Sequence, residues 1–152
     1  MQEINHKDFS KDNKKLAFKT TLHCVIGCGT GDTVGLIIGT LFNFSIMPTM
    51  ALGIILGFIG GYGLTMTPLL KRGFTIKNAT KITISSETAS ILVMETAENL
   101  TAYLIPGILT AAIFTYLFWL GLIISVIAGF IAAYPVNYFM ISKGLKEAHI
   151  HH

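Results

Sequence analysis

The stretch ITISSETASILVMETAENLTAYL, residues 82–104, decides how many times this chain crosses a membrane. It is long enough to span the hydrocarbon core of a bilayer, which takes about 20 residues. It also carries three acids, Glu87, Glu95 and Glu98, which make it a poor membrane segment by itself. If the stretch crosses, its acids must be covered by protein, and the fold then contains a polar seam.

The chain around this stretch is too apolar for a water-soluble domain. Of its 152 residues, 52% are hydrophobic and 12% are charged, and the mean hydropathy is +0.64. Soluble domains carry about 25% charged residues. Three further apolar runs, at 20–42, 47–70 and 108–141, are each long enough to cross a bilayer. The composition therefore predicts an all-α, polytopic membrane protein.

The distribution of Lys and Arg predicts its topology. The eleven residues form three clusters, which lie before the first run, between residues 71 and 81, and at the C-terminal end. Such clusters remain on the cytoplasmic side of a membrane. All three reach that side only if residues 82–104 also cross. We therefore expect a multi-pass protein of the cell membrane with both termini cytoplasmic and four transmembrane helices at about 20–42, 47–70, 79–104 and 108–141.

These helices would form one domain. We expect a single four-helix transmembrane domain over residues 20–142, with a polar, basic juxtamembrane segment at 1–19 before it. A short cytoplasmic tail, residues 143–152, would follow. The lipid bilayer is then the first partner of the protein. The net charge of +3 lies at the membrane flanks, and we expect no nucleic-acid partner.

Small residues recur at every fourth position of three predicted helices. Positions four apart lie on nearly one helix face, and such stripes let membrane helices approach closely. Packing within one bundle is the simpler interpretation. Contact between copies is the alternative, which favours a homo-oligomer or a subunit of a membrane complex. The glycines that we expect at helix contacts are Gly27, Gly31, Gly35, Gly39, Gly53, Gly57, Gly121 and Gly129.

The first predicted helix carries several reactive groups among its glycines. At about 100° per residue, Cys24 and Cys28 share the glycine face, with Asp32 at one edge and His23 at the other. Taken alone, a pair of membrane cysteines behaves as two small apolar residues. Taken together, thiol, imidazole and carboxylate suit a transition metal.

The third predicted helix carries its acids on one side. Glu87 and Glu98 fall within about 20° of each other around the helix, and Glu95 within about 80° of Glu87. An ionised group in hydrocarbon costs at least about 2.5 kcal/mol, so this side must face the bundle interior. No Lys or Arg lies in residues 20–70 or 82–142. The acids must therefore be protonated, hydrogen-bonded, hydrated or neutralised by a bound cation.

Depth along the two helices divides these residues into groups. The ligands of an inner zinc or copper site would be His23, Cys24, Cys28 and Glu87. The residues that relay protons or the ion through the membrane would be Asp32, Glu95 and Glu98. Further metal ligands in the C-terminal tail would be His149, His151 and His152.

Three functional hypotheses follow. The first is a small membrane protein that binds, and conducts or exchanges, a transition-metal cation, zinc or copper. The second is a non-catalytic accessory subunit of a larger membrane complex, and the third a proton- or cation-coupled transporter of a small solute. No Ser-His-Asp order, nucleophile elbow, phosphate loop or dinucleotide fingerprint occurs, so we do not expect an enzyme.

Several motifs resemble those of one family. They are HCVIGCxxGD at 23–32, YGLxxxPLL at 62–70, SIxVMExxxN at 90–99 and AYPVN at 133–137. Together they resemble a bacterial and archaeal membrane family known as domain of unknown function 4396. The resemblance covers about residues 20–152. It implies a four-helix membrane fold and brings no established activity.

Overall fold

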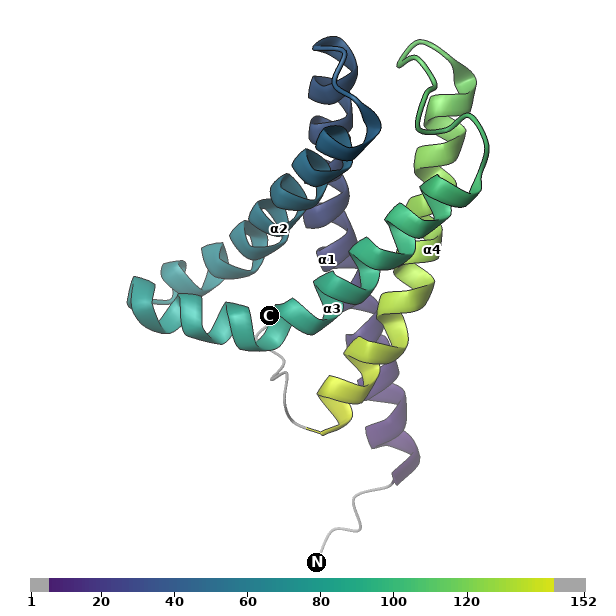
Figure 1. The fold of residues 1–152 in the computed structure, drawn as a ribbon. Coiled ribbons are helices and arrows are strands. Elements are labelled where there is room, and N and C mark those ends of the chain that lie inside the picture. The colour runs from purple at the N-terminus through teal and green to yellow at the C-terminus, as the bar shows by residue number, and fades with distance from the viewer. Residues whose placement is uncertain (1–5, 144–152) are drawn as a thin grey trace, which may run out of the picture.

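The computed structural model describes residues 6–143, and side chains from residue 12 onward. In this part of the chain it contains α-helices and no strand. α1 and α3 run toward one end of the bundle, and α2 and α4 return from it (Figure 1). We call that end the loop end, because it holds the α1–α2 turn and the α3–α4 loop. The opposite end, where α1 begins and α4 ends, is the terminal end. The helices are α1 (His6–Leu41), α2 (Ile46–Lys71), α3 (Ile76–Leu104) and α4 (Tyr116–Ser142).

Three of the helices are long and apolar enough to cross a membrane. They are Asp12–Leu41 within α1, all of α2 and all of α4, and α4 is the most apolar of them. Their lengths exceed the roughly 20 residues that a bilayer core requires. The all-helical class is thereby confirmed, and the composition and helix lengths are those of a membrane protein. α3 has 29 residues but falls outside this set.

Two helix boundaries differ from the expected ones by more than three residues, and α3 begins three residues early, at Ile76. α1 begins at His6 rather than at residue 20, because no Gly or Pro precedes Gly27 to end a helix in the basic segment. α4 begins at Tyr116 rather than at residue 108. The apolar residues between are not helical: the loop folds back over the start of α4 and buries Ile108 against Gly121.

The contact between α1 and α2 is made by backbone. A Cβ added at Gly35 would lie 2.5 Å from the Cα of Gly53, and one at Gly27 would lie 2.9 Å from the Cα of Gly61. A Cβ at Gly31 would collide with the carbonyl of Leu56. No larger residue fits at these positions, so the glycine faces bring the two helix axes together.

α3 is polar on its buried side and apolar on its exposed side. Its exposed residues include Ile84, Leu92, Leu100 and Tyr103. The buried positions recur every three or four residues, which is the period of one helix face. The polar members of this buried face are Thr83, Ser86, Glu87, Ser90, Glu95 and Glu98.

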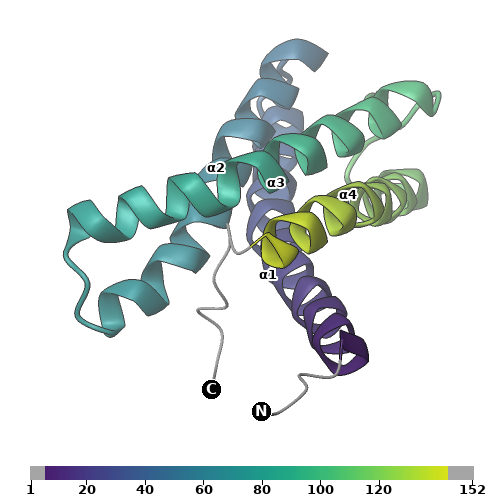
Figure 2. The same cartoon turned by 90° about the horizontal axis from the view of Figure 1, so that it is seen from below.

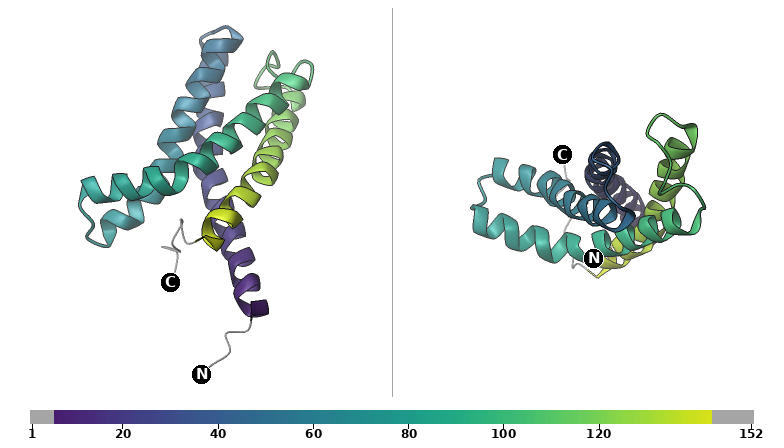
Figure 3. Two further views of the ribbon diagram at one scale, coloured as in Figure 1. Left: turned by 60° about the horizontal axis from the view of Figure 1, so that its bottom comes forward. Right: turned by 45° about the horizontal axis from the view of Figure 1, so that its top comes forward.

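The α2–α3 hairpin projects away from α1 and α4 at the end that holds its turn. Figure 2, seen from below, and both views of Figure 3 show its tip apart from the other two helices. A hydrogen bond of 2.8 Å between the hydroxyls of Tyr62 and Thr88 joins its two helices. Four cations, Lys71, Arg72, Lys77 and Lys81, lie exposed at this tip.

Candidate functional site

Three acids from two helices meet in the interior of the bundle. Asp32 of α1 is 8% exposed, and Glu95 and Glu98 of α3 are 3% and 5% exposed. The carboxyl group of Asp32 is within hydrogen-bonding reach of both glutamates. The glutamates themselves interact only over a longer range. The three groups therefore form a row, Glu95–Asp32–Glu98, with Asp32 in the middle; we call it the acidic row.

Glycines of two neighbouring helices make room for the acidic row. A Cβ at Gly57 of α2 would collide with Glu95 and would lie 3.0 Å from Oδ1 of Asp32. A Cβ at Gly129 of α4 would collide with Oε1 of Glu98. The carboxyl groups thus lie directly on helix backbone, and side chains at these glycines would displace them.

Few donors reach the acidic row. The side-chain amide of Asn99 donates to the carbonyl oxygen of Glu95 at 2.8 Å and to its Oε2 at 3.5 Å. Oε1 of Glu95 and Oε1 of Glu98 are buried without an N–H or hydroxyl donor. Because carboxylates only accept hydrogen bonds, a bond between Asp32 and either glutamate requires a proton on one of the two groups.

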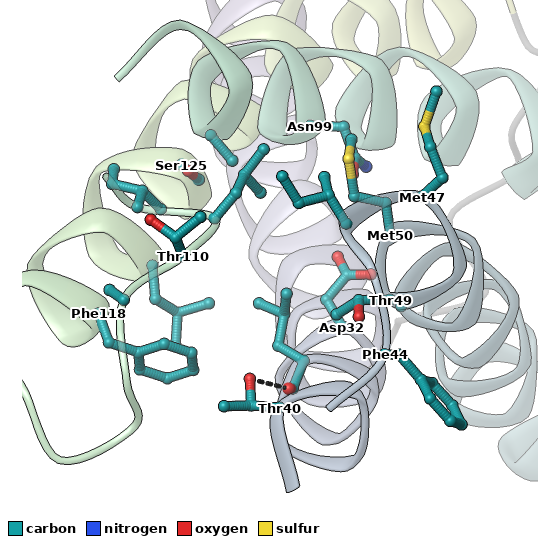
Figure 4. Close-up of a pocket in the computed structure, with 18 of the residues that line it drawn as sticks. Asp32, Thr40, Phe44, Met47, Thr49, Met50, Asn99, Thr110, Phe118 and Ser125 are labelled. Carbon is teal, nitrogen blue, oxygen red and sulfur yellow. Dashed lines mark hydrogen bonds between the residues drawn. The ribbon is translucent and has the colours of Figure 1, made fainter. Parts of the chain in front are cut away.

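A cavity of about 550 Å³ opens beside the acidic row at the loop end. Asp32 and Glu98 belong to its wall, together with Asn99 of α3 and Ser125 of α4. Figure 4 shows Asp32, Thr40 and Ser125 around this space, with Met47 and Met50 of α2 opposite the α3–α4 loop. The two acids therefore reach a space that lies between the α1–α2 turn and the α3–α4 loop.

The two thiols lie one and two helical turns from Asp32, toward the terminal end. The Sγ atoms of Cys24 and Cys28 are 4.0 Å apart and are not joined by a disulfide. They pack with Ile91, Met94 and Ala133 in an apolar cluster. Cys28 also interacts electrostatically with Asp32 and Glu95, so the thiol pair continues the line of the acidic row.

The four residues expected at an inner metal site do not form one compact group. His23 is half-buried, while Cys24, Cys28 and Glu87 are buried. Within the described residues, no three Cys, His, Asp or Glu side chains are grouped so that they can hold one metal ion. The zinc or copper site stays a prediction. The tail residues His149, His151 and His152 lie outside the described residues.

A chain of hydrogen bonds joins three helices at the terminal end. Ser90 of α3 donates to Oδ1 of Asn137 of α4 at 2.6 Å. The Asn137 amide donates to Oγ1 of Thr21 of α1 at 2.9 Å, and Thr21 donates to the carbonyl of Ala17 at 2.8 Å. We call Thr21, Ser90 and Asn137 the polar latch. Sequence reasoning missed this pairing, although an amide that continues the small-residue stripe of an apolar helix was a usable signal.

The cavity wall was missed as well. Thr40, Thr49, Asn99 and Ser125 supply its polar groups beside the acids. Asn99 ends one of the motifs noted above, but nothing in the sequence assigns these residues to a cavity. Hydroxyls are common in membrane helices because they bond to the preceding turn, as Thr40 does to the carbonyl of Leu36 at 2.8 Å. Only the folded arrangement separates the cavity-lining hydroxyls from the others.

Fold and site together define a helical membrane protein with a buried acidic row beside a cavity. A family model described as Domain of unknown function (DUF4396) matches residues 14–146. The chain belongs to this family, and the resemblance seen in its motifs is confirmed. No curated protein and no solved structure matches it.

Proposed function

We propose that this protein spans the cell membrane four times, with both termini cytoplasmic, and conducts a cation along the acidic row. The observation that carries the proposal is a set of three buried carboxyl groups, with Asp32 within hydrogen-bonding reach of both glutamates, and no Lys or Arg anywhere in residues 20–70 or 82–142. Acids inside a membrane are costly and mark ion pathways and proton relays.

The burial pattern of α3 supports a fourth span. Its apolar residues, such as Ile84, Leu92 and Leu100, are exposed, while its glutamates are buried. A helix on the surface of a water-soluble bundle has the opposite pattern. Exposed apolar residues are favourable only where lipid covers them, and the oblique course of α3 between the other helices (Figure 1) is compatible with a tilted crossing.

The shape of the acidic row favours protons as the conducted cation. Asp32 contacts both glutamates, which interact with each other only at longer range. Such a row can pass a proton from one carboxyl group to the next, because each pair shares one proton between two acceptors. A metal ion instead requires several donors that converge on one point.

A transition metal, zinc or copper, is the second candidate. The thiols of Cys24 and Cys28 and the thioether of Met94 belong to one cluster, and Cys28 is one turn from Asp32. Soft sulfur ligands favour Cu(I) and zinc over sodium or calcium. In this version the thiols would take part in ion transfer to the acidic row.

The proposal is tested by ion flux into proteoliposomes. The purified full chain is reconstituted with a pH dye or a Zn²⁺ or Cu⁺ dye inside, and a potassium–valinomycin potential drives uptake. We expect proton uptake above that of empty vesicles, and Asp32→Asn should abolish it by breaking the row at its centre. Asp12→Asn is the matched control, because it makes the same change at an exposed position of the same helix.

The outcomes separate the candidates. If the vesicles take up metal but no protons, and the double variant Cys24→Ala, Cys28→Ala removes the metal uptake, then the conducted cation is the metal and not the proton. Uptake of neither cation, with co-purification of unrelated subunits at fixed stoichiometry, would overturn the proposal in favour of an accessory subunit. Equal flux in wild type and Asp32→Asn would remove the acidic row from any pathway.

A further inference from the structure

We propose that the cavity at the loop end binds a small organic cation, an amine with an apolar body, against Asp32 and Glu98. This inference deepens the proposed function, on which it rests for a membrane-embedded acidic row. It names a class of ligand for Asp32 and Glu98, the two members of the acidic row that line the cavity.

The size of the cavity points beyond an inorganic ion. Its volume of about 550 Å³ falls in the range of small-molecule sites, about 300–1,000 Å³. A water molecule occupies about 30 Å³, so a single proton or metal ion leaves nearly all of this space unused. A path for ions alone does not require it.

The distribution of polar groups in the wall selects a charged end and an apolar end. Asp32 and Glu98 supply carboxyl groups, while Met50, Phe118 and Leu122 supply apolar surface. No Lys or Arg is among the lining residues. An anion would meet two acids without a compensating cation, and a purely apolar molecule would leave the acids uncompensated. An amphipathic amine satisfies both parts of the wall.

Unpartnered acceptors provide a second, independent sign of a ligand. Oγ of Ser125 is buried without a hydrogen-bond partner among the described residues, and Oε1 of Glu98 receives no N–H or hydroxyl donor from them. Both residues line the cavity, and they are 5% and 6% exposed. Buried polar atoms normally find partners. An ammonium group carries three donors and no acceptor, which matches acceptors supplied by Asp32, Glu98 and Ser125 from three different helices.

Equilibrium dialysis of the full chain in lipid nanodiscs tests the inference. The probes are butylamine and phenethylamine, with 2-phenylethanol and phenylacetate as analogues of nearly the same size that lack the positive charge. We expect saturable binding of an amine, with several-fold weaker binding of the alcohol and none of the carboxylate. Equal binding of amine and alcohol would mean apolar partitioning and would overturn the inference, as would failure of both amines to bind.

A matched pair of loop variants locates the binding. Ala111 lines the cavity and is half-buried, whereas its neighbour Ala112 is exposed and is not a lining residue. Ala111→Phe should fill the cavity and abolish amine binding, and Ala112→Phe should leave it unchanged. If both variants bind alike, the amine lies elsewhere and the inference is wrong.

The inference and the proposed function fail separately. Dialysis is carried out without an ion gradient, and the flux assay without amine. Amine binding without cation flux would leave the cavity assigned and refute conduction. Flux without amine binding would do the reverse. Ser125→Ala gives a further readout, because loss of one acceptor should weaken amine binding by several-fold while the carboxyl groups remain in place.

Discussion

At the loop end of the bundle, polar side chains line a cavity, whereas at the terminal end they bond to one another. Ser125 at the loop end is buried without a partner, and Asp32 reaches the open space. Ser90 and Asn137 at the terminal end are joined at 2.6 Å, and the thiol cluster packs between them and the acidic row. Polar side chains thus line an accessible cavity at the loop end, and at the terminal end they join helices to one another.

This difference suggests why the acidic row lies where it does. The row reaches the cavity through Asp32 and Glu98, and the apolar thiol cluster and the polar latch lie on its other side. A pathway that is open at both ends would leak. For the conduction proposed above, access from one end at a time is the arrangement that a gated carrier requires.

The largest expected effect comes from the α1–α2 contact that both ends share. Gly31→Ala places a Cβ against the carbonyl of Leu56 and must push the two backbones apart. Overpacking of this kind costs about 1–3 kcal/mol, and more where backbone cannot yield. We expect a large fall in the free energy of unfolding, measured in mixed micelles with increasing SDS.

Gly63→Ala is the control for that measurement. A Cβ at Gly63, also within a helix, meets nothing within 4 Å. Because Ala is a better helix former than Gly by about 1 kcal/mol in water, this variant should be as stable as the wild type or slightly more so. Equal losses in both variants would show that the α1–α2 contact is looser than the structure has it.

A smaller effect is expected from Asn137→Leu, which removes the centre of the polar latch. It breaks the bonds from Ser90 and to Thr21 and leaves the Ser90 hydroxyl with the thioether of Met140, at 3.8 Å, as its acceptor. Hydrogen bonds between membrane helices contribute about 0.6 kcal/mol on average and at most about 1.7. We therefore expect a loss of about 1–3 kcal/mol in the same SDS titration.

Asn99→Leu applies the same substitution at the loop end. Among the described residues, the Asn99 amide bonds to Glu95 alone, one turn back on its own helix, so its removal separates no helices. We expect a smaller loss of stability than for Asn137→Leu. If the two losses are alike, the terminal end is no more tightly joined than the loop end, and the contrast between them fails.

The helical class and the polar side of α3 were predictable from the sequence, because both follow from the helical repeat of about 3.6 residues per turn. Residues 82–104 alternate acids and hydroxyls with apolar residues at helical spacing, and the folded helix buries the polar ones. The cavity was not predictable in this way. The loop that bounds it, from 105 to 115, is as apolar as a helix, and only the packing of Ile108 on Gly121 distinguishes it.

The polar latch was unpredictable for a different reason. Thr21 and Asn137 are 116 residues apart in the chain, and helical periodicity assigns a residue to a face without naming its partner on another helix. The predicted metal site has the same weakness. Depth and face put His23 and Glu87 near the thiols, whereas the grouping of ligands depends on side-chain directions that periodicity does not contain.

The smallest expected effect is a difference in the reaction rates of single cysteines introduced at the two ends, in a chain whose own Cys24 and Cys28 are replaced by alanine. Ser125 and Ser86 are 6% and 7% exposed, and Ser→Cys changes little in size, yet only Ser125 lines the cavity. A small, membrane-impermeant methanethiosulfonate reagent should therefore modify Ser125→Cys several-fold faster than Ser86→Cys, because water reaches the cavity. Bound phenethylamine should slow the first reaction and leave the second unchanged. Equal rates, in the presence or absence of the amine, would mean that burial alone governs access and that the cavity does not open to water at the loop end.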